Sequence, residues 1–272
     1  MTCNVELLCV GNELLVGKTV NTNATWLARK ISNIGGSLNR VTTISDDLRE
    51  IRKSTKIILA QKPDFLITSG GLGPTFDDVT IKGLSQALRR RMKINKEALD
   101  QIRARYKRIF SSRRFALTKF RVKMATFPIG AVPLLNPVGT APGMALQVGK
   151  TLIVCLPGVP KELRAIFSKH VAPIIKLKAG TGGYVSRSVS VRGIHESELA
   201  PLIDRVMKRY PEVYVKSHPQ GGEGRAKSRI EMDFSYSGHE IEKGNRVVSG
   251  AIAQMMRHLS GKAQVEKKHQ SA

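Results

Sequence analysis

Residues 68–80 of the chain are Thr68-Ser69-Gly70-Gly71-Leu72-Gly73-Pro74-Thr75-Phe76-Asp77-Asp78-Val79-Thr80. An apolar run at 65–67 precedes this stretch, and apolar residues with helical spacing follow it, so the sequence predicts a strand, a glycine loop and a helix. Glycines let the backbone approach an anionic ligand closely, and the N-terminus of a helix favours negative charge. We therefore predict that a phosphate-bearing ligand binds at this loop.

Two adjacent carboxylates, Asp77 and Asp78, follow the glycines. A carboxylate next to a phosphate can hold a divalent metal ion such as Mg²⁺. Adjacent side chains diverge by about 100° at the start of a helix, so we expect one aspartate to cap the helix and the other to be functional. Which residue takes which role stays open here. Thr75 and Thr80 are candidates to donate hydroxyl hydrogen bonds to phosphate, or equally to hold the turn and the helix start.

The first 90 residues alternate between strand and helix patterns. A buried strand at 5–10, a helix to about 34, a strand at 38–44 and a helix opened by Asp47 all come before the glycine loop. This order predicts right-handed βαβ units and a parallel sheet with helices on both faces. Ligands of such sheets lie at the carboxyl ends of the strands. The loop at 11–23 and the loop at 70–78 both fall there, so they could face one crevice.

The segment from Gly11 to Thr19 superficially resembles a P-loop, because it follows a strand and ends in Gly-Lys-Thr. Its spacing is wrong, since five residues rather than four separate Gly11 from Gly17. We therefore do not expect an ATPase. Glu13 and Asn23 are instead predicted to be polar ligands of a different site. The six histidines form no zinc motif, and no nucleophile elbow is present.

Basic residues dominate the charge of the chain, with 45 Lys and Arg against 21 Asp and Glu. Such a charge attracts nucleic acids, anionic membranes or phosphorylated small molecules. Residues 89–123 are the most basic segment, with 14 basic and two acidic side chains. We interpret this segment as a solvated charged face on a helix at about 95–110, and a polyanion-binding surface is the alternative.

A second, smaller α+β domain is predicted after the glycine-rich residues 179–183. We place the domains at 1–179 and 184–261, followed by a flexible tail at 262–272. Cys3, Cys9 and Cys155 are predicted to be buried, reduced thiols. We expect no signal peptide and no membrane span, and hence a cytoplasmic location.

Several loops together resemble those of one known family, the competence/damage-inducible CinA family. Its main domain is similar to the molybdopterin-binding domain of MoaB and Mog proteins. The resemblance covers roughly residues 4–178 and includes Gly11-Asn12-Glu13-Leu14-Leu15, Asn21-Thr22-Asn23, the stretch 70–80, Asn136 with Gly139-Thr140-Ala141-Pro142-Gly143, and Leu156-Pro157-Gly158-Val159-Pro160-Lys161-Glu162.

The resemblance implies a three-layer α/β/α domain, often a homodimer, and in some members a divalent-metal-dependent ADP-ribose pyrophosphatase. It implies that Gly70, Gly71, Gly73 and Thr75 hold phosphate, and that Asp77 or Asp78 binds metal or orients water. Glu13, Asn23, Thr140, Gly143 and Gly158 would complete the pocket. The nicotinamide mononucleotide deamidase domain of longer members is not expected.

Three functions follow as hypotheses. The first is a Mg²⁺-dependent or similar hydrolase of a nucleoside diphosphate derivative such as ADP-ribose. The second is a non-catalytic protein that binds a pterin or nucleotide phosphate, because a fold does not fix a function. The third is nucleic-acid binding through the basic segment, and this hypothesis depends on charge alone.

Overall fold

The structure is a computed structural model that describes residues 3–110, 116–180, 183–220, 229–238, 240–261 and 263–267. The chain divides into two compact units, one formed by residues 1–32 and 36–178 and the other by residues 33–35 and 179–272. We describe each unit by itself.

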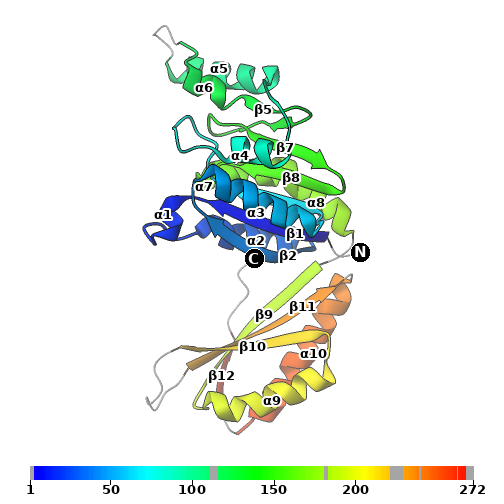
Figure 1. The fold of residues 1–272 in the computed structure, drawn as a ribbon. Helices are drawn as coiled ribbons and strands as arrows, with labels where there is room; N and C mark the ends of the chain where they lie inside the picture. The colour runs from blue at the N-terminus through cyan, green and yellow to red at the C-terminus, as the bar shows by residue number, and fades with distance from the viewer. Residues whose placement is uncertain are drawn as a thin grey trace. The chain divides into compact units, whose positions relative to one another are not determined.

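The first unit alternates strands and helices along the chain (Figure 1). Its elements are β1 (Cys3–Val10), α1 (Asn12–Leu15), α2 (Thr22–Asn33), β2 (Gly36–Ile44), α3 (Leu48–Ala60), β3 (Phe65–Ser69), α4 (Thr80–Ala87), β4 (Met92–Ile94), α5 (Lys96–Ile109), α6 (Lys119–Lys123), β5 (Thr126–Pro128), β6 (Val132–Leu134), β7 (Gly143–Val148), β8 (Thr151–Leu156), α7 (Pro160–Ile166), a π-helical turn (Phe167–Val171) and α8 (Ala172–Ala179).

Six strands form the central sheet of this unit in the order β2-β1-β3-β8-β7-β6. The pairs β1–β2, β1–β3 and β3–β8 are parallel, whereas β7 runs antiparallel to both of its neighbours. The prediction of a mostly parallel sheet is confirmed. A tight connection at Gly149 and Lys150 joins β7 to β8.

Helices cover both faces of the sheet, which gives three layers. On one face, α3, α4 and α5 contribute Ile51, Leu84 and Ile102 to a core that contains Leu8 and Leu66 of the sheet. On the other face, Trp26 of α2 packs edge-on against Phe167 of the π-helical turn, with ring centroids 5.6 Å apart. Because β1, β3 and β8 are buried on both faces, they appear in the sequence as nearly continuous apolar runs.

Short polar signals fix where the helices begin. Asp47 accepts hydrogen bonds from the backbone N–H groups of Arg49 and Glu50 at the start of α3. Asn95 accepts one from Ala98 at the start of α5. Such caps satisfy N–H groups that have no partner within the helix. These caps explain why the starts of α3 and α5 could be predicted from the sequence.

The second unit is a four-stranded antiparallel sheet with helices against one face. Its elements are β9 (Gly183–Arg192), α9 (Glu196–Arg209), β10 (Val213–Gln220), β11 (Arg229–Gly238), α10 (Ile241–Leu259) and β12 (Gln264–Lys267), and the strand order is β10-β11-β9-β12. The prediction of a separate, smaller α+β unit agrees with the structure. Residues 264–267, which the sequence assigned to a flexible tail, instead form β12 and pair with β9.

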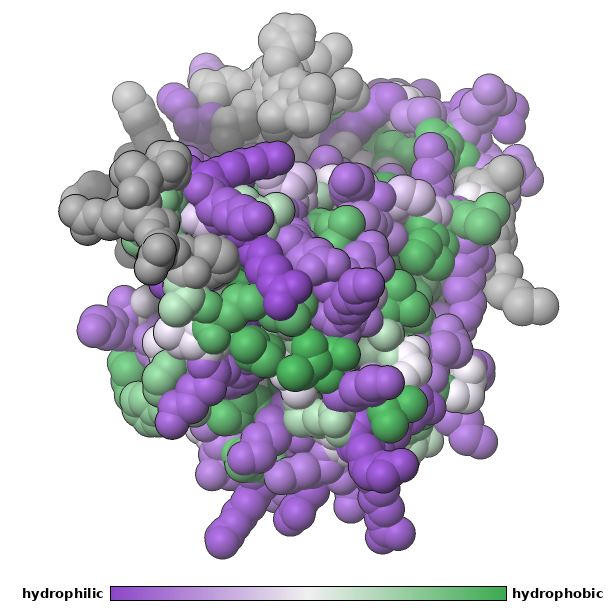
Figure 2. All heavy atoms as spheres, turned by 90° about the horizontal axis from the view of Figure 1, so that it is seen from above, coloured by the Kyte–Doolittle hydropathy of each residue, from purple (hydrophilic) through white to green (hydrophobic). Residues whose placement is uncertain are grey.

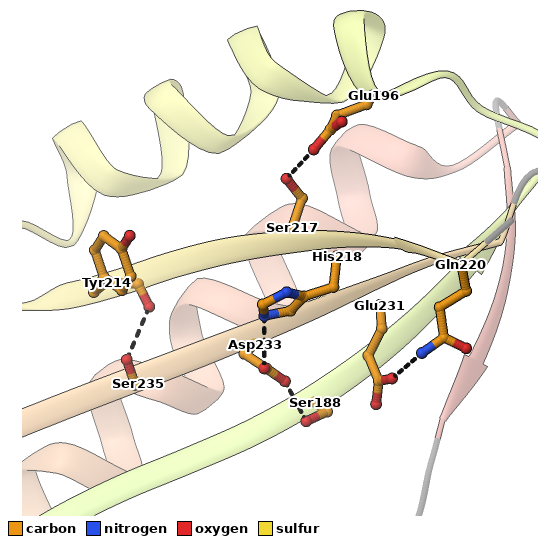
Figure 3. A network of polar contacts seen from close by, with 9 residues as sticks. All are labelled: Ser188, Glu196, Tyr214, Ser217, His218, Gln220, Glu231, Asp233 and Ser235. Atoms are coloured by element: carbon orange, nitrogen blue, oxygen red, sulfur yellow. Dashed lines mark hydrogen bonds and ion pairs between the residues drawn. The ribbon is translucent and has the colours of Figure 1, made fainter. Parts of the chain in front are cut away.

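The two faces of this second sheet differ in polarity. Alternate residues such as Val215, Phe234 and Met232 pack into a core with α9 and α10. Figure 3 shows a network of polar contacts in this unit, in which Asp233 accepts a hydrogen bond from Ser188 and lies 3.2 Å from Nε2 of His218. This alternation is the period-two pattern of a sheet with one apolar face.

Some sequence predictions concern residues outside those that the structure describes. These are Phe115 in the basic segment, most of the glycine-rich turn at 220–224, and residues 181–182 of the linker.

Cys3, Cys9 and Cys155 are free and buried as predicted. Burial raises the pKa of the Cys155 thiol to about 12, so it stays protonated at neutral pH. In the described part of the chain, no helix is long and apolar enough to span a bilayer.

Candidate functional site

Loops from several strand ends enclose a cavity of about 540 Å³ at the carboxyl edge of the parallel strands. The loops follow β1, β2, β3 and β8, and the loop between β6 and β7 adds a wall. Most of the predicted site residues line this cavity, namely Glu13, Asn23, Gly70, Gly71, Gly73, Asp77, Asp78, Thr140 and Gly158. The prediction that the loops at 11–23 and 70–78 face one crevice is therefore confirmed.

The glycine loop is tightly constrained by the backbone around it. Gly70 has a φ of +104°, and a Cβ at this position would lie 2.2 Å from the carbonyl oxygen of Val10. Gly71 has a φ of +68°, and its Cβ would lie 2.1 Å from Oγ1 of Thr80. Only glycine fits both the dihedral angles and the space. The loop is thereby pressed against the end of β1 with its backbone bare on the cavity side.

Thr80 holds this loop from behind. It is fully buried, and its hydroxyl donates a hydrogen bond to the carbonyl oxygen of Gly70 at 2.9 Å. The sequence had offered Thr80 as a phosphate donor or as a residue of the helix start. The structure supports the second role, because the hydroxyl is used inside the protein and does not line the cavity.

Asp77 and Asp78 lie before α4, in the loop, and both bond to Thr75. The Thr75 hydroxyl contacts Oδ1 of Asp77, and it lies 2.5 Å from Oδ2 of Asp78, which also accepts the Thr75 backbone N–H at 2.8 Å. Helix α4 begins at Thr80 with Val79 as its N-cap and no side-chain cap. The expectation that one aspartate caps the helix is therefore wrong, because both aspartates lie in the turn before the N-cap residue Val79.

The two aspartates differ in exposure and in partners. Asp78 is half-buried and closes the turn through its two bonds to Thr75, whereas Asp77 is exposed. The Thr75 hydroxyl lowers the pKa of Asp77, and the cation of Lys123 lowers it to a smaller degree. Asp77 thus stays ionised at neutral pH and is the better placed of the two to bind a ligand.

Asn23 joins three walls of the cavity. It lies in the first turn of α2, where the sequence analysis had expected loop, and its Nδ2 donates to the carbonyl oxygen of Gly158 at 2.7 Å and to Oγ of Ser69 at 3.3 Å. These bonds fix the amide orientation, so Oδ1 is a buried acceptor with no hydrogen-bond partner among the described residues. A buried acceptor of this kind is costly to leave unpaired. It could accept an N–H or O–H group of a ligand.

Asp46 is a cavity residue that the sequence analysis missed. Its Oδ2 accepts the backbone N–H of Asn12 at 2.8 Å. Burial raises the pKa of Asp46, although the N–H of Asn12 opposes this effect. The negative charges of Glu13, Asp77 and Asp78 raise it further. The available signal was its position directly after the end of β2, the same location that had marked Glu13 and Asp77.

Glu162 is a second cavity carboxylate without a predicted role, although it lies in a motif that had been noticed. Its Oε2 accepts a hydrogen bond from Nδ2 of Asn136 at 2.6 Å. The other end of the Asn136 amide accepts the N–H groups of Val138 and Gly139, so the amide orientation is fixed. Burial raises the pKa of Glu162, and the Asn136 bond partly opposes this effect.

Thr75 and Gly143 do not line the main cavity. Thr75 supports the two aspartates, as described above. Gly143 begins β7, where a Cβ would lie 2.8 Å from the carbonyl oxygen of Cys155. The glycine therefore allows β7 and β8 to pack closely, and it does not line the ligand cavity.

The charge of the cavity lining is opposite to that of the chain. Its carboxylates are Glu13, Asp46, Asp77, Asp78 and Glu162, and the described lining residues include no Lys, Arg or His. Several arginines of the basic segment are instead bonded within the protein, such as Arg90 to the carbonyl of Ile129 and Arg121 over the ring of Tyr106. Nucleic-acid binding by this segment stays a prediction.

The donor set bears on the predicted metal. Within the described residues, no group of three or more His, Cys, Asp or Glu side chains could hold a metal ion alone. Mg²⁺ is commonly bound through one or two carboxylates together with phosphate oxygens and water. The pair Asp77 and Asp78 fits a metal that binds together with a phosphate ligand, and it does not fit a closed protein site.

Comparisons with known proteins agree with these features. Residues 6–177 match the family described as a probable molybdopterin binding domain. A protein of Pyrobaculum calidifontis is 46% identical over 256 residues, which cover 94% of this chain and 95% of the relative. The crystal structure of the protein CinA, of unknown function, from Thermoplasma acidophilum is 39% identical, has a TM-score of 0.57, and covers 61% of this chain and 95% of that chain. The chain therefore belongs to the family of the probable molybdopterin binding domain, and its resemblance to CinA is confirmed.

Proposed function

We propose that the protein is a metal-dependent hydrolase of a nucleoside diphosphate derivative such as ADP-ribose. The observation that supports this proposal most directly is the position of Asp77, beside a backbone-lined glycine loop and in the same cavity. A glycine loop suits phosphate, and an ionised carboxylate next to it suits a divalent cation.

The acidity of the cavity makes a cation necessary for a phosphate ligand. A diphosphate placed among these carboxylates without a counter-charge would be repelled by each of them. A divalent ion on Asp77 would neutralise phosphate oxygens and lower the pKa of a bound water. The protein's own part is to orient that site, because Thr75 and Asp78 hold the turn on which Asp77 lies.

The proposed reaction is hydrolysis of the phosphoanhydride bond. Water attacks one phosphorus, the P–O–P bridge breaks, and ADP-ribose yields AMP and ribose 5-phosphate. Partial burial raises the pKa values of Asp46 and Glu162, so each is suited to exchange a proton with water or with a leaving oxygen. The unpaired Oδ1 of Asn23 would accept a ligand hydroxyl.

The test is incubation of the purified protein with ADP-ribose and a panel of divalent metals, with AMP measured by chromatography. We expect AMP release that requires metal, is abolished by EDTA, and falls at least about 100-fold in Asp77→Asn. Asp100→Asn is the matched control, because Asp100 is an exposed aspartate on α5 that does not line the cavity. Absence of AMP with every metal would refute the hydrolase.

The second candidate is a non-catalytic protein that binds a pterin phosphate. It is supported by the description of the family as a probable molybdopterin binding domain. The carboxyl groups of Asp46 and Glu162, which line the cavity, are also suited to accept hydrogen bonds from the N–H groups of a heterocycle. Saturable binding of a pterin phosphate in calorimetry, without turnover of any diphosphate, would favour this function over the first.

A further inference from the structure

A second cavity lies on the other side of the glycine loop. It has a volume of about 420 Å³ and shares Gly71, Leu72, Gly73, Asp78 and Met124 with the main cavity. The loop is therefore a common wall between two hollows, each within the size range of small-molecule sites. A ligand with its phosphates on this wall could extend into both.

The lining of this second cavity is aromatic and apolar. It includes Phe76, which precedes the two aspartates, and Phe120 of α6, together with Ile81 and Met92. Phe76 is 88% exposed and Phe120 is 51% exposed, so neither ring is accounted for by packing in the core. Figure 2 shows that apolar side chains gather on the face that carries α5 and α6, with hydrophilic side chains around them.

Its charge is opposite to that of the main cavity. Lys82 and Lys123 line it, and Nζ of Lys119 lies 5.3 Å from the centroid of the Phe120 ring. Lys123 also donates to the carbonyl oxygen of Thr75, and its charge favours the ionised form of Asp77. Exposed aromatic faces bordered by lysines suit a planar ring that carries a phosphate.

We infer that this second cavity binds the purine base of a nucleoside phosphate, stacked on Phe76 and Phe120, while the phosphates lie on the glycine loop. This assignment rests on the proposed function, since it takes the phosphate at that loop as given. The other end of the ligand then lies in the acidic main cavity. Carboxylates and the unpaired Oδ1 of Asn23 are acceptors, and they match the hydroxyl groups of a sugar.

The experiment compares two ligands that differ only by the base. Binding of AMP and of ribose 5-phosphate is measured by calorimetry at a fixed Mg²⁺ concentration. Neither ligand contains a phosphoanhydride bond, so the measurement does not depend on catalysis. The variants are Phe76→Ala, Phe120→Ala and Phe76→Tyr, and Tyr214→Ala is the control because it removes an aromatic ring that is 56% exposed in the second unit.

We expect Phe76→Ala and Phe120→Ala each to weaken AMP binding by about 5- to 150-fold. Phe76→Tyr, which keeps the ring face, should bind AMP like the natural protein, as should Tyr214→Ala. The affinity for ribose 5-phosphate should stay within about twofold in all four variants, because this ligand has no base to stack. Thermal unfolding should be unchanged for Phe76→Ala, since an exposed ring contributes little to stability.

Three results would overturn the inference. One is unchanged AMP affinity in both alanine variants, and another is equal weakening of AMP and ribose 5-phosphate. The third is failure of AMP to bind at millimolar concentration. Light scattering provides a further check, because a change of oligomeric state with unaltered AMP affinity would assign the aromatic patch to contacts between copies of the chain. Loss of the proposed hydrolysis with AMP binding as expected would refute only the catalysis.

Discussion

Replacement of Thr80 by valine tests how much the Thr80 hydroxyl contributes to stability and to ligand binding by supporting the glycine loop from behind. Valine has nearly the same shape, so the change removes only the hydrogen bond from the hydroxyl to the Gly70 carbonyl oxygen, which is 2.9 Å long and fully buried. A lost hydrogen bond of this kind costs about 1 kcal/mol, and an unsatisfied buried carbonyl costs about 1–3 kcal/mol. We expect a loss of about 1–2 kcal/mol in stability, or roughly 2–8 °C in Tm for a unit of this size.

The matched control is Thr151→Val. Thr151 is also buried, and its hydroxyl donates to the carbonyl oxygen of Pro63 at 2.6 Å, at the start of β8 and away from the cavity. Both variants should lose similar stability in urea unfolding. Only Thr80→Val should also weaken Mg²⁺–AMP binding in calorimetry. The affinity should fall by about 5- to 30-fold if the full 1–2 kcal/mol is lost from the free energy of binding at the loop. Equal AMP affinity in the two variants would refute the idea that the Thr80 hydroxyl shapes the phosphate site.

Four further substitutions test other parts of the first unit. Gly71→Ala should lower the free energy of unfolding in urea by about 2–4 kcal/mol, because it combines a φ of +68° with a methyl group 2.1 Å from Oγ1 of Thr80. Its control, Gly149→Ala, has a φ of +56° with open space around it and should cost about 1 kcal/mol. Asn136→Ala should cost about 2–4 kcal/mol, because the amide forms hydrogen bonds with three loop backbone groups and with the carboxylate of Glu162 on α7. Burial raises the pKa of Glu6 in the folded state, so the free energy of unfolding falls as the pH rises through this raised pKa. Glu6→Gln should remove this decrease in the free energy of unfolding measured from pH 4 to 8.

The fold of the first unit was predictable because its sequence signals are local and agree with one another. Runs such as Val5–Val10 are apolar apart from Glu6, as expected for strands buried on both faces. Asp47 and Asn95 mark helix starts by side-chain caps. The short strands β4, β5 and β6 were not predicted, since three residues carry no readable periodicity. Strand β12 was missed because its pairing with β9 joins distant parts of the chain.

The site was predictable where loops follow strands, and less so where side-chain partners decide the role. Glu13, Asn23 and Gly158 converge because the carboxyl ends of parallel strands share an edge. Sequence spacing could not show that Thr80 faces away from the cavity, or that Gly143 serves strand packing. It also could not show that the basic chain encloses an acidic cavity, because the lysines near the loop line its other side.

Asp77 and Asp78 show how a tertiary contact can reverse a local rule. Adjacent side chains on a helix diverge, and this rule had separated the two carboxylates. The turn Gly73-Pro74-Thr75 instead brings both of them to one hydroxyl, and α4 begins only at Thr80. One hydroxyl has one proton, so it can be donated to only one of the two carboxylates at a time. The half-buried Asp78, which also accepts the Thr75 N–H, is the structural partner, and the exposed Asp77 keeps its oxygens available for a cation. Loss of metal response should therefore follow Asp77→Asn, whereas loss of stability should follow Asp78→Ala.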